Sequence, residues 1–496
     1  MRLALVLMGG GARAAYQAGV LQALAEIARE VEPARRELPF AIVCGSSAGA
    51  INAAAIASHA DDFPRGAARL LSFWEHLRAE MIYRTDWLGV AGAGARWLAA
   101  MSVGWAARRA PRGLLDNAPL ADLLRRELDF HRIGQMLGAR RLHALSITAL
   151  SYTSGRHLTF YAGSEPIHAW RRAQRTARMV DLSAAHLLAS SAIPFVFPAV
   201  PLVIDGRIEY FGDGSIRQIA PLSPAIHFGG DRIVVIGAAA ARPEVPAANG
   251  HAVGYPSLAQ IGQQVLASVF LDSIGTDIER IEHVNRVVEH LPRQIEPESG
   301  WRHVDVLAIA PSERIELIAA KHLRRLPLTV RGLLGAIGGN QPAGASFASY
   351  LLFEAEFTRE LIALGHADAL RQRETLAAWL ASASPGGGPP ATAHGLPAGG
   401  LAPAVVDSPG AALSAAAPAV AEPFTTETRV VESPGAESSA AGPPAAESAA
   451  VKTRVAGPLV AEPPAASPPP ASSGSDGAMP PNSSPIGSLS ERNDRR

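Results

Sequence analysis

The chain has 496 residues, of which 48% are hydrophobic and 18% are charged, so it carries enough apolar material for a large core. Lys plus Arg and Asp plus Glu both number 45, and this balance argues against a nucleic-acid-binding protein, which usually has a basic domain or stripe. The single cysteine, Cys44, excludes an intramolecular disulfide and fits a reducing compartment. We therefore expect a cytoplasmic protein.

The first predicted element is a buried strand at Leu3–Leu7. Arg2 followed by this apolar run resembles the start of a signal peptide, but the run is short and ends at Gly9, so no signal peptide is expected. The most apolar later window, Ala41–Ser58, is interrupted by glycine and serine and is shorter than the roughly 20 residues that span a bilayer. We predict no transmembrane helix.

A glycine loop, Gly9-Gly10-Gly11-Ala12-Arg13, follows the first strand and precedes a helix predicted at Ala14–Arg29. Glycines leave backbone N–H groups uncovered at a helix N-terminus, where they favour negative charge, and an oxyanion hole needs such donors. The alternative is a tight turn without a chemical role. For Arg13 two interpretations stay open, a contact with a phosphate and a clamp that holds the loop.

The same loop also fits a dinucleotide-binding fingerprint, because Gly9, Gly11 and Ala14 match G-x-G-x-x-[GA]. That site needs an acidic residue at the end of the second strand. The second predicted strand, Phe40–Cys44, leads into glycine and serine without a carboxylate. The sequence therefore disfavours a nucleotide site.

A G-x-S-x-G sequence, Gly45-Ser46-Ser47-Ala48-Gly49, joins the strand Phe40–Cys44 to a helix predicted at Ala48–Ala57. A nucleophile elbow holds its serine on a strained strand-to-helix turn, and small neighbours are needed because that turn is crowded. The pattern predicts that Ser47 is a nucleophile and that Ser46 supports the turn. The alternative is a turn whose small residues serve packing alone.

Further along the chain, Trp97, Met101 and Trp105 are spaced by four residues and share one face of a predicted helix, with Arg108-Arg109 after them. Tryptophan beside basic residues suits a helix at a lipid surface. A helix packed into the core explains the same spacing. Peripheral membrane contact through this face is one of two open interpretations.

The rest of the body alternates strands and helices, which predicts an α/β fold.

From Ser384 to Arg496 the chain is rich in Ala, Pro, Ser and Gly and cannot bury enough surface to offset its ordering entropy. We expect one catalytic domain over residues 1–380 and a disordered tail over residues 384–496, whose partners are unknown. The remaining predicted elements are a helix beginning at Asp116–Pro119, strands at Leu142–Ser151 and His157–Tyr161, a helix at Leu182–Ser191, and strands at Leu202–Ile204, Arg207–Phe211, Arg232–Ile236 and Val304–Ile309.

A third motif, Asp213-Gly214-Ser215, follows the strand Arg207–Phe211. Alone it is an ordinary turn. The order of the glycine loop, the serine elbow and a distant Asp-Gly turn resembles the patatin-like phospholipases. The resemblance covers about residues 1 to 375 and includes four further stretches, Arg112–Leu120, His186–Pro198, Gly212–Pro224 and Ser349–Leu364.

The resemblance implies a three-layer α/β/α sandwich with a largely parallel central sheet, a Ser-Asp dyad, and no metal or organic cofactor. It assigns the nucleophile to Ser47, the base to Asp213, and the oxyanion donors to the N–H groups around Gly10, Gly11 and Ala12. Two positions depart from the family pattern: Ala14 stands where the loop usually ends in glycine, and Ser215 stands where Gly or Ala often follows the Asp-Gly pair. Neither departure removes a reacting group.

The resemblance predicts hydrolysis of acyl esters of phospholipids, lysophospholipids or related lipids. An α/β-hydrolase esterase with a Ser-His-Asp triad is the alternative enzyme, but its elbow normally follows several strands and Ser47 follows only two. A scaffold whose tail recruits partners is the non-enzyme alternative, and the presence of both Ser47 and Asp213 argues against it. The 15 histidines form no pair with metal-ligand spacing, so no metal site is expected.

Overall fold

The computed structural model describes residues 1–86, 113–167, 169–172, 174–216, 218–237, 273–290, 301–336 and 345–382. The helix face of Trp97, Met101 and Trp105 and the tail from Ser384 to Arg496 lie outside the described residues, so both stay predictions. Within the described ranges, no helix has the length and apolar character needed to cross a bilayer.

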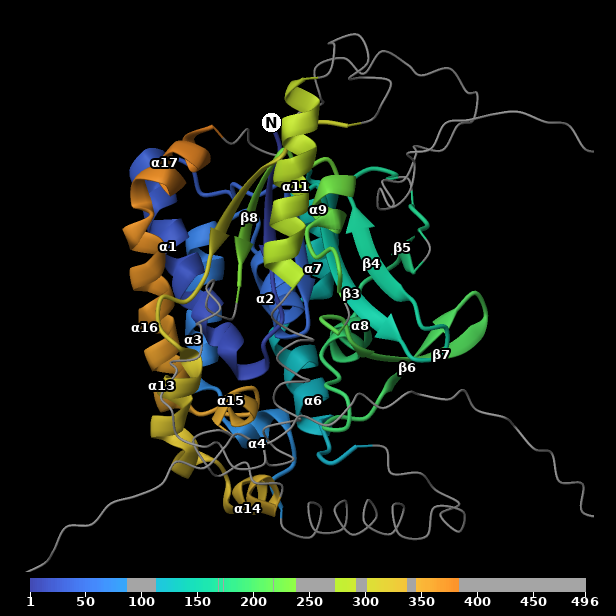
Figure 1. The fold of residues 1–496 in the computed structure, drawn as a ribbon, viewed down its shortest axis with the longest axis vertical. Coiled ribbons are helices and arrows are strands. Elements are labelled where there is room, and N and C mark those ends of the chain that lie inside the picture. The colour runs from blue at the N-terminus through green and yellow to red at the C-terminus, as the bar shows by residue number, and fades with distance from the viewer. Residues whose placement is uncertain are drawn as a thin grey trace, which may run out of the picture. The chain divides into compact units, whose positions relative to one another are not determined.

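The described strands form one nine-stranded sheet with the order β5-β4-β3-β2-β1-β8-β9, to which β7 and β6 are added beside β3 (Figure 1). The parallel pairs of neighbouring strands are β1 with β2, β1 with β8, β2 with β3, β8 with β9, and β4 with β5. β3 is antiparallel to β4 and β7, and β6 to β7. The strands are β1 Leu3–Leu7, β2 Ile42–Ser46, β3 Ala144–Ser151, β4 His157–Gly163, β5 Arg175–Met179, β6 Val200–Ile204, β7 Arg207–Asp213, β8 Arg232–Ile236 and β9 Asp305–Ile309.

Helices cover both faces of this sheet. Alternate residues of a strand point to opposite faces, and in β1 Leu3, Leu5 and Leu7 join the core under α1 (Ala15–Val31), α2 (Ala48–Ala57) and α3 (Phe63–His76). Val6 and its neighbours on the other face pack with α9 (Ser223–His227) and α11 (Ser273–Glu289), which lie in front of the strands in Figure 1. The predicted three-layer α/β/α sandwich with a largely parallel sheet is confirmed.

The described helices agree with most of the predicted ones, and α2 has the predicted bounds. Four helices and one strand described before residue 237 were not predicted, namely α3, α4, α7, α9 and β5. The helices are α1 Ala15–Val31, α2 Ala48–Ala57, α3 Phe63–His76, α4 Ala79–Ile82, α6 Ala118–Glu127, α7 Phe130–Gly138, α8 Ala184–Ser190, α9 Ser223–His227, α11 Ser273–Glu289, α13 Ile315–His322, α14 Leu328–Ala336, α15 Ala345–Ala348, α16 Ala355–Arg371 and α17 Arg373–Ala381, with 3-10 turns η1 Gly11–Ala14 and η2 Leu323–Arg325.

The register of β3 brings the ends of β2 and β7 together. One edge of β3 carries β4, and the other edge carries first β2, whose Ser46 lies opposite Thr148, and then β7, whose Asp213 lies opposite Ala149. Because β2 is parallel to β3 and β7 is antiparallel, the carboxyl ends of β2 and β7 face each other along this edge. The residue after β2 and the last residue of β7 therefore meet.

Candidate active site

Ser47 sits on the turn between β2 and α2 and is buried. Its φ is 53°, in the left-handed region that non-glycine residues rarely adopt. Backbone strain of this kind persists only where the surrounding structure enforces it, and it concentrates at functional sites. The strand-to-helix context predicted for the elbow is present.

Asp213 receives a hydrogen bond directly from Ser47. Ser47 Oγ donates to Asp213 Oδ2 at 2.6 Å, and both groups are buried. The other carboxylate oxygen, Oδ1, accepts from the backbone N–H of Ser215 at 2.9 Å, and the N–H of Asp213 donates to the Ala192 carbonyl at 2.9 Å. Contacts on both sides thus fix the carboxylate toward the serine.

Burial raises the pKa of Asp213 to about 6, although hydrogen bonds from Ser47 and Ser215 lower it. A buried carboxylate prefers its neutral form because water no longer stabilises the charge. A base works best when its pKa lies near the operating pH, where it is deprotonated and still able to hold a proton. At neutral pH Asp213 is therefore mostly a carboxylate that can accept the proton of Ser47.

Ser190, which belongs to none of the sequence motifs, connects the serine elbow to the Asp-Gly turn. Its hydroxyl accepts from the backbone N–H of Ser47 at 2.8 Å and donates to the Thr148 carbonyl at 2.6 Å. Its own carbonyl accepts from the N–H of Gly214 at 3.0 Å. A residue at the end of α8 thus links the elbow, the Asp-Gly turn and β3.

The other motif residues lie close around the Ser47–Asp213 pair. Ser215 Oγ donates to Ser46 Oγ at 3.2 Å, which ties the Asp-Gly turn to the elbow. A Cβ on Gly9 would lie 2.7 Å from the Ser47 Cβ, and one on Gly214 would lie 1.7 Å from the Thr148 carbonyl oxygen. Glycine is required at both positions because the chains approach too closely for a side chain.

The glycine loop supplies fewer free N–H groups than the sequence suggested. The N–H of Ala12 donates to the Tyr350 carbonyl at 3.0 Å, and that of Arg13 donates to Gly10 at 3.1 Å. Among the described residues, the N–H groups of Gly10 and Gly11 donate to no carbonyl. These two groups are the candidates left for contact with an oxyanion.

A buried polar network fixes the loop relative to α2. Asn52 Nδ2 donates to the Ala14 carbonyl at 3.1 Å and to Gln17 Oε1 at 2.9 Å. Gln17 Nε2 donates to the Met8 carbonyl at 2.7 Å, and Trp74 Nε1 donates to Asn52 Oδ1 at 2.8 Å. Both ends of the glycine loop are thereby tied to the helix that begins at the serine.

Residues 5–226 match the family model described as patatin-like phospholipase, and this range contains the glycine loop, Ser47 and Asp213. This part of the chain is a patatin-like phospholipase domain. The match supports lipid acyl hydrolysis as its general activity.

Two other comparisons add little. The crystal structure of VipD from Legionella pneumophila is similar over 73% of this chain and 67% of that chain, at 13% identity and a TM-score of 0.24. A likeness at this level carries no argument about function. No curated protein matches the chain.

Arg13 clamps the glycine loop of the patatin-like domain to the C-terminal helices. Its guanidinium is fully buried, with Nε donating to Ser349 Oγ at 2.7 Å and Nη2 donating to the Ser346 carbonyl at 3.0 Å. Nη1 pairs with Glu316 Oε1 at 2.9 Å, and the group stacks over the Tyr350 ring at 4.2 Å. Of the two interpretations left open for Arg13, these contacts favour the clamp.

We expect Arg13→Ala to lower the free energy of unfolding by about 3 kcal/mol, because truncating one partner of a buried ion pair leaves the other partners uncompensated. Arg13→Lys should recover only part of this loss, since an ammonium lacks the planar fork that reaches several acceptors. Urea denaturation of the purified variants measures both effects. An Arg13→Ala variant as stable as the wild type would contradict the clamp.

Within the described ranges, no histidine hydrogen-bonds to Ser47 or Asp213. Three of the described histidines after Asp213 pair with acidic residues elsewhere: His303 with Asp305, His322 with Glu360 and His366 with Glu26. His227 stacks on Trp170 at 4.4 Å. His251 lies outside the described residues.

An apolar pocket of the patatin-like domain opens beside Ser47. We call it the serine pocket. The start of α2, the end of α3, α4, the start of α6 and the chain after α8 contribute to its wall. Apart from Gly11, Ser47 and Ser191, its wall consists of Ala48, Ile51, Phe73, Trp74, Leu77, Ile82, Leu120, Ile193, Phe197 and Phe353. Such a wall suits a hydrocarbon group attached to the reacting carbonyl.

Proposed function

We propose that this domain hydrolyses acyl esters of phospholipids, lysophospholipids or related lipids, with Ser47 as nucleophile and Asp213 as general base. The observation that carries the proposal is the 2.6 Å hydrogen bond from Ser47 Oγ to Asp213 Oδ2, made next to an apolar pocket. A serine hydroxyl is a weak nucleophile until a neighbouring base takes its proton.

In the acylation step, Ser47 Oγ attacks the ester carbonyl carbon and its proton passes to the Asp213 carboxylate. Charge then develops on the carbonyl oxygen, where the N–H groups of Gly10 and Gly11 are the proposed donors. When the tetrahedral intermediate collapses, the bond to the alcohol oxygen breaks. Asp213 returns the proton to that oxygen, and the alcohol leaves.

Deacylation repeats the steps with water. A water molecule gives its proton to Asp213 while its oxygen attacks the carbonyl carbon of the acyl-enzyme. The bond to Ser47 Oγ then breaks, the proton returns to that oxygen, and the fatty acid leaves. One carboxylate thus serves as base and acid in both halves of the reaction.

A Ser-His-Asp triad is the alternative enzyme mechanism. It requires an imidazole between the serine and the acid, whereas Ser47 donates to Asp213 without an intermediate group. The direct contact therefore favours the dyad. Peripheral contact with a lipid surface follows from the substrate class and is part of the proposal.

Purified protein should release fatty acid from at least one class in a panel of phospholipids and lysophospholipids, and a fluorophosphonate probe should label Ser47. Peptide mapping of the labelled protein locates the modified residue. Heat-denatured protein is the control for unspecific labelling. Label on a different serine, or an inert panel, would contradict the proposal.

A further inference from the structure

Ser215 lies at the point where the three sequence motifs meet. The residue is buried, and its Oγ lies 3.2 Å from Ser46 Oγ in the serine elbow. A Cβ on Gly9 would lie 2.1 Å from the same oxygen, so the hydroxyl packs directly against the first residue of the glycine loop. Ser215 is also one of the two positions at which the chain departs from the family pattern. A glycine or alanine there would bring no hydroxyl to this point.

The same residue makes two hydrogen bonds with the base. The backbone N–H of Ser215 donates to Asp213 Oδ1 at 2.9 Å, which brings the Ser215 side chain next to the carboxylate. The hydroxyl of Ser215 forms the second bond, and both bonds favour the ionised form of Asp213. A hydroxyl donates one proton and accepts at its two lone pairs. Ser215 can therefore donate to Asp213 while its oxygen accepts from Ser46.

The described titratable groups that interact with Asp213 stay uncharged in the pH range where this carboxylate titrates. Burial, together with the charge of Asp213, raises the pKa of Tyr152 to about 12. Burial also raises the pKa of Tyr350. The guanidinium of Arg13, which lies over the Tyr350 ring, pairs with Glu316 at 2.9 Å. Within the described residues, the ionised form of Asp213 is thus stabilised by hydrogen-bond donors and not by an opposite charge.

We propose that Ser215 is a positioning residue for the base, whose hydroxyl stabilises the ionised carboxylate of Asp213 and so extends hydrolysis to mildly acidic pH. This inference rests on the proposed hydrolase function. A hydrogen bond to the charged form of a group favours that form. Without it, burial would keep Asp213 protonated over a wider range of pH, and a protonated base cannot accept the proton of Ser47. Ser215 acts through Asp213 and is not itself a reacting group.

Ser215→Ala tests the proposal, because it removes the hydroxyl and keeps the backbone N–H bond to Asp213. The rate at which a fluorophosphonate labels Ser47 is measured from pH 4.5 to pH 9, since this reaction needs the base but not the natural substrate. In the wild type the rate should rise with a midpoint of about 6. In the variant the midpoint should lie about 1 pH unit higher, the size expected for losing one hydrogen bond to a charged group.

The size of the effect should depend on pH. At pH 5 the variant should react about tenfold more slowly than the wild type, and at pH 9 the two rates should agree within about twofold. A residue needed only for packing would instead lower the rate by one factor at every pH and leave the midpoint in place. Ser215→Gly, which also lacks the hydroxyl, should show the same midpoint as Ser215→Ala. Thermal unfolding checks the fold, and either folded variant suffices for the test.

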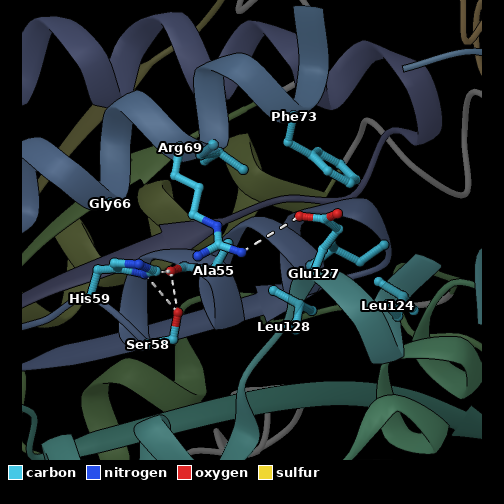
Figure 2. A pocket seen from close by; sticks show the side chains of 11 residues that line it. Ala55, Ser58, His59, Gly66, Arg69, Phe73, Leu124, Glu127 and Leu128 are labelled. Atoms are coloured by element: carbon cyan, nitrogen blue, oxygen red, sulfur yellow. Dashed lines mark hydrogen bonds and ion pairs between the residues drawn. The ribbon is translucent and has the colours of Figure 1, made fainter. Parts of the chain in front are cut away.

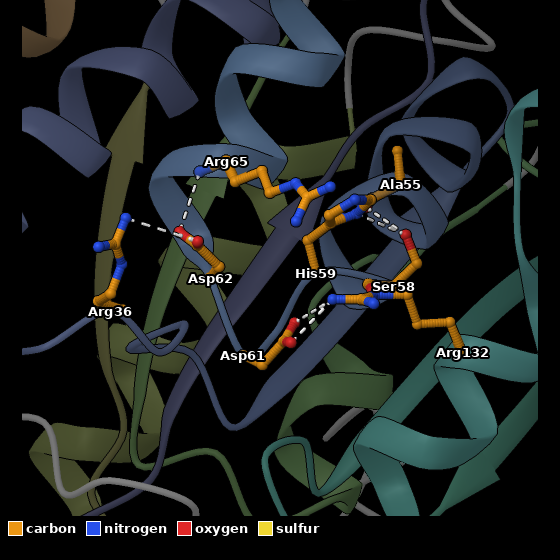
Figure 3. A network of polar contacts seen from close by, with 8 residues as sticks. All are labelled: Arg36, Ala55, Ser58, His59, Asp61, Asp62, Arg65 and Arg132. Carbon is orange, nitrogen blue, oxygen red and sulfur yellow. Dashed lines mark hydrogen bonds and ion pairs between the residues drawn. The ribbon is translucent and has the colours of Figure 1, made fainter.

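Ser58→Ala is the matched control. Ser58 is a buried serine at the opposite end of α2 from the elbow, and its hydroxyl donates to the Ala55 carbonyl at 2.8 Å. Figure 2 shows this hydroxyl beside the His59 ring, among the residues that line a pocket between α2, α3 and α6. Figure 3 shows it next to the ion pair of Asp61 with Arg132. The control loses one buried hydroxyl far from the base, so its midpoint should equal that of the wild type and its rates should agree within about twofold.

The outcomes separate the two proposals. A label that survives Ser47→Ala would overturn the proposed function. A label that depends on Ser47, with the same midpoint in the wild type and the Ser215 variants, would overturn the role of Ser215 alone. A midpoint that moves by the same amount in Ser58→Ala, or that falls when the Ser215 hydroxyl is removed, would overturn it as well.

Discussion

Asp213→Asn should abolish acyl-enzyme formation and lower kcat/KM by about 10³-fold or more, because an amide cannot accept the proton of Ser47. The contact that is lost is the 2.6 Å bond to a buried carboxylate. Asp205→Asn is the matched control, since Asp205 lies at the exposed turn between β6 and β7 and pairs with Arg178. Stopped-flow detection of the acyl-enzyme burst measures the effect.

Asp213→Asn should also change how the stability of the protein depends on pH. The pKa of Asp213 is raised by burial from 3.8 to about 6, so the folded state binds the proton more tightly than the unfolded chain does. Protonated Asp213 therefore adds to the free energy of unfolding. This contribution is fully present below pH 3.8 and is lost as the pH rises through about 6. A rise of this size corresponds to at most about 3 kcal/mol. Asp213→Asn should therefore be at least as stable as the wild type at pH 8, with a gain that shrinks toward pH 5.

The pH profile of the wild type follows from the same pKa. The value of kcat/KM should rise with pH through about 6 as Asp213 loses its proton. A histidine base titrates in the same range, so substitutions decide between the mechanisms. One downstream histidine whose change to Ala silences a folded enzyme would overturn the dyad, whereas we expect each such change to cost less than about tenfold.

Ser47→Ala should lower kcat by more than about 10⁴-fold and remove labelling by a fluorophosphonate, because the attacking oxygen is gone. The fold should remain, since alanine keeps the Cβ and the turn is held from outside through the backbone N–H of Ser47 and Ser190. Thermal unfolding checks the fold, and fatty-acid release checks the activity.

Ser46→Ala is the matched control for the nucleophile. Ser46 adjoins Ser47 and loses only a 3.2 Å contact with Ser215 when it is truncated. This variant should keep its label and stay within about tenfold of the wild-type rate. A Ser47→Ala protein with more than about 1% of wild-type activity, or with the label moved to Ser46, would contradict the assignment.

The sequence predicted those parts of the fold and site whose signals are local. β1 is a short apolar run next to glycines, and the serine elbow is a five-residue pattern between a strand and a helix. The helix α3 also carries local signals, a cap at Asp62 and Pro64 in the first turn, which were overlooked. β5, Arg175–Met179, has no apolar pattern, and pairing with β4 holds it in the sheet.

Other features depend on contacts between distant parts of the chain. Ser190 is one of many serines, and its role depends on the approach of Ser47 and Thr148 in space. Arg13 could be assigned as a clamp only once Ser346, Ser349 and Glu316 were placed around it.

The meeting of β2 and β7 on one edge of β3 makes the Ser47–Asp213 distance depend on only a small part of the chain that separates these residues. They are 166 positions apart, yet their spacing is set by two consecutive residues of β3, Thr148 and Ala149, and by the contacts of Ser190. Insertions and deletions elsewhere in the intervening chain should leave that register intact. Such a design can change its substrate-facing segments extensively during evolution and keep the same pair of reacting groups.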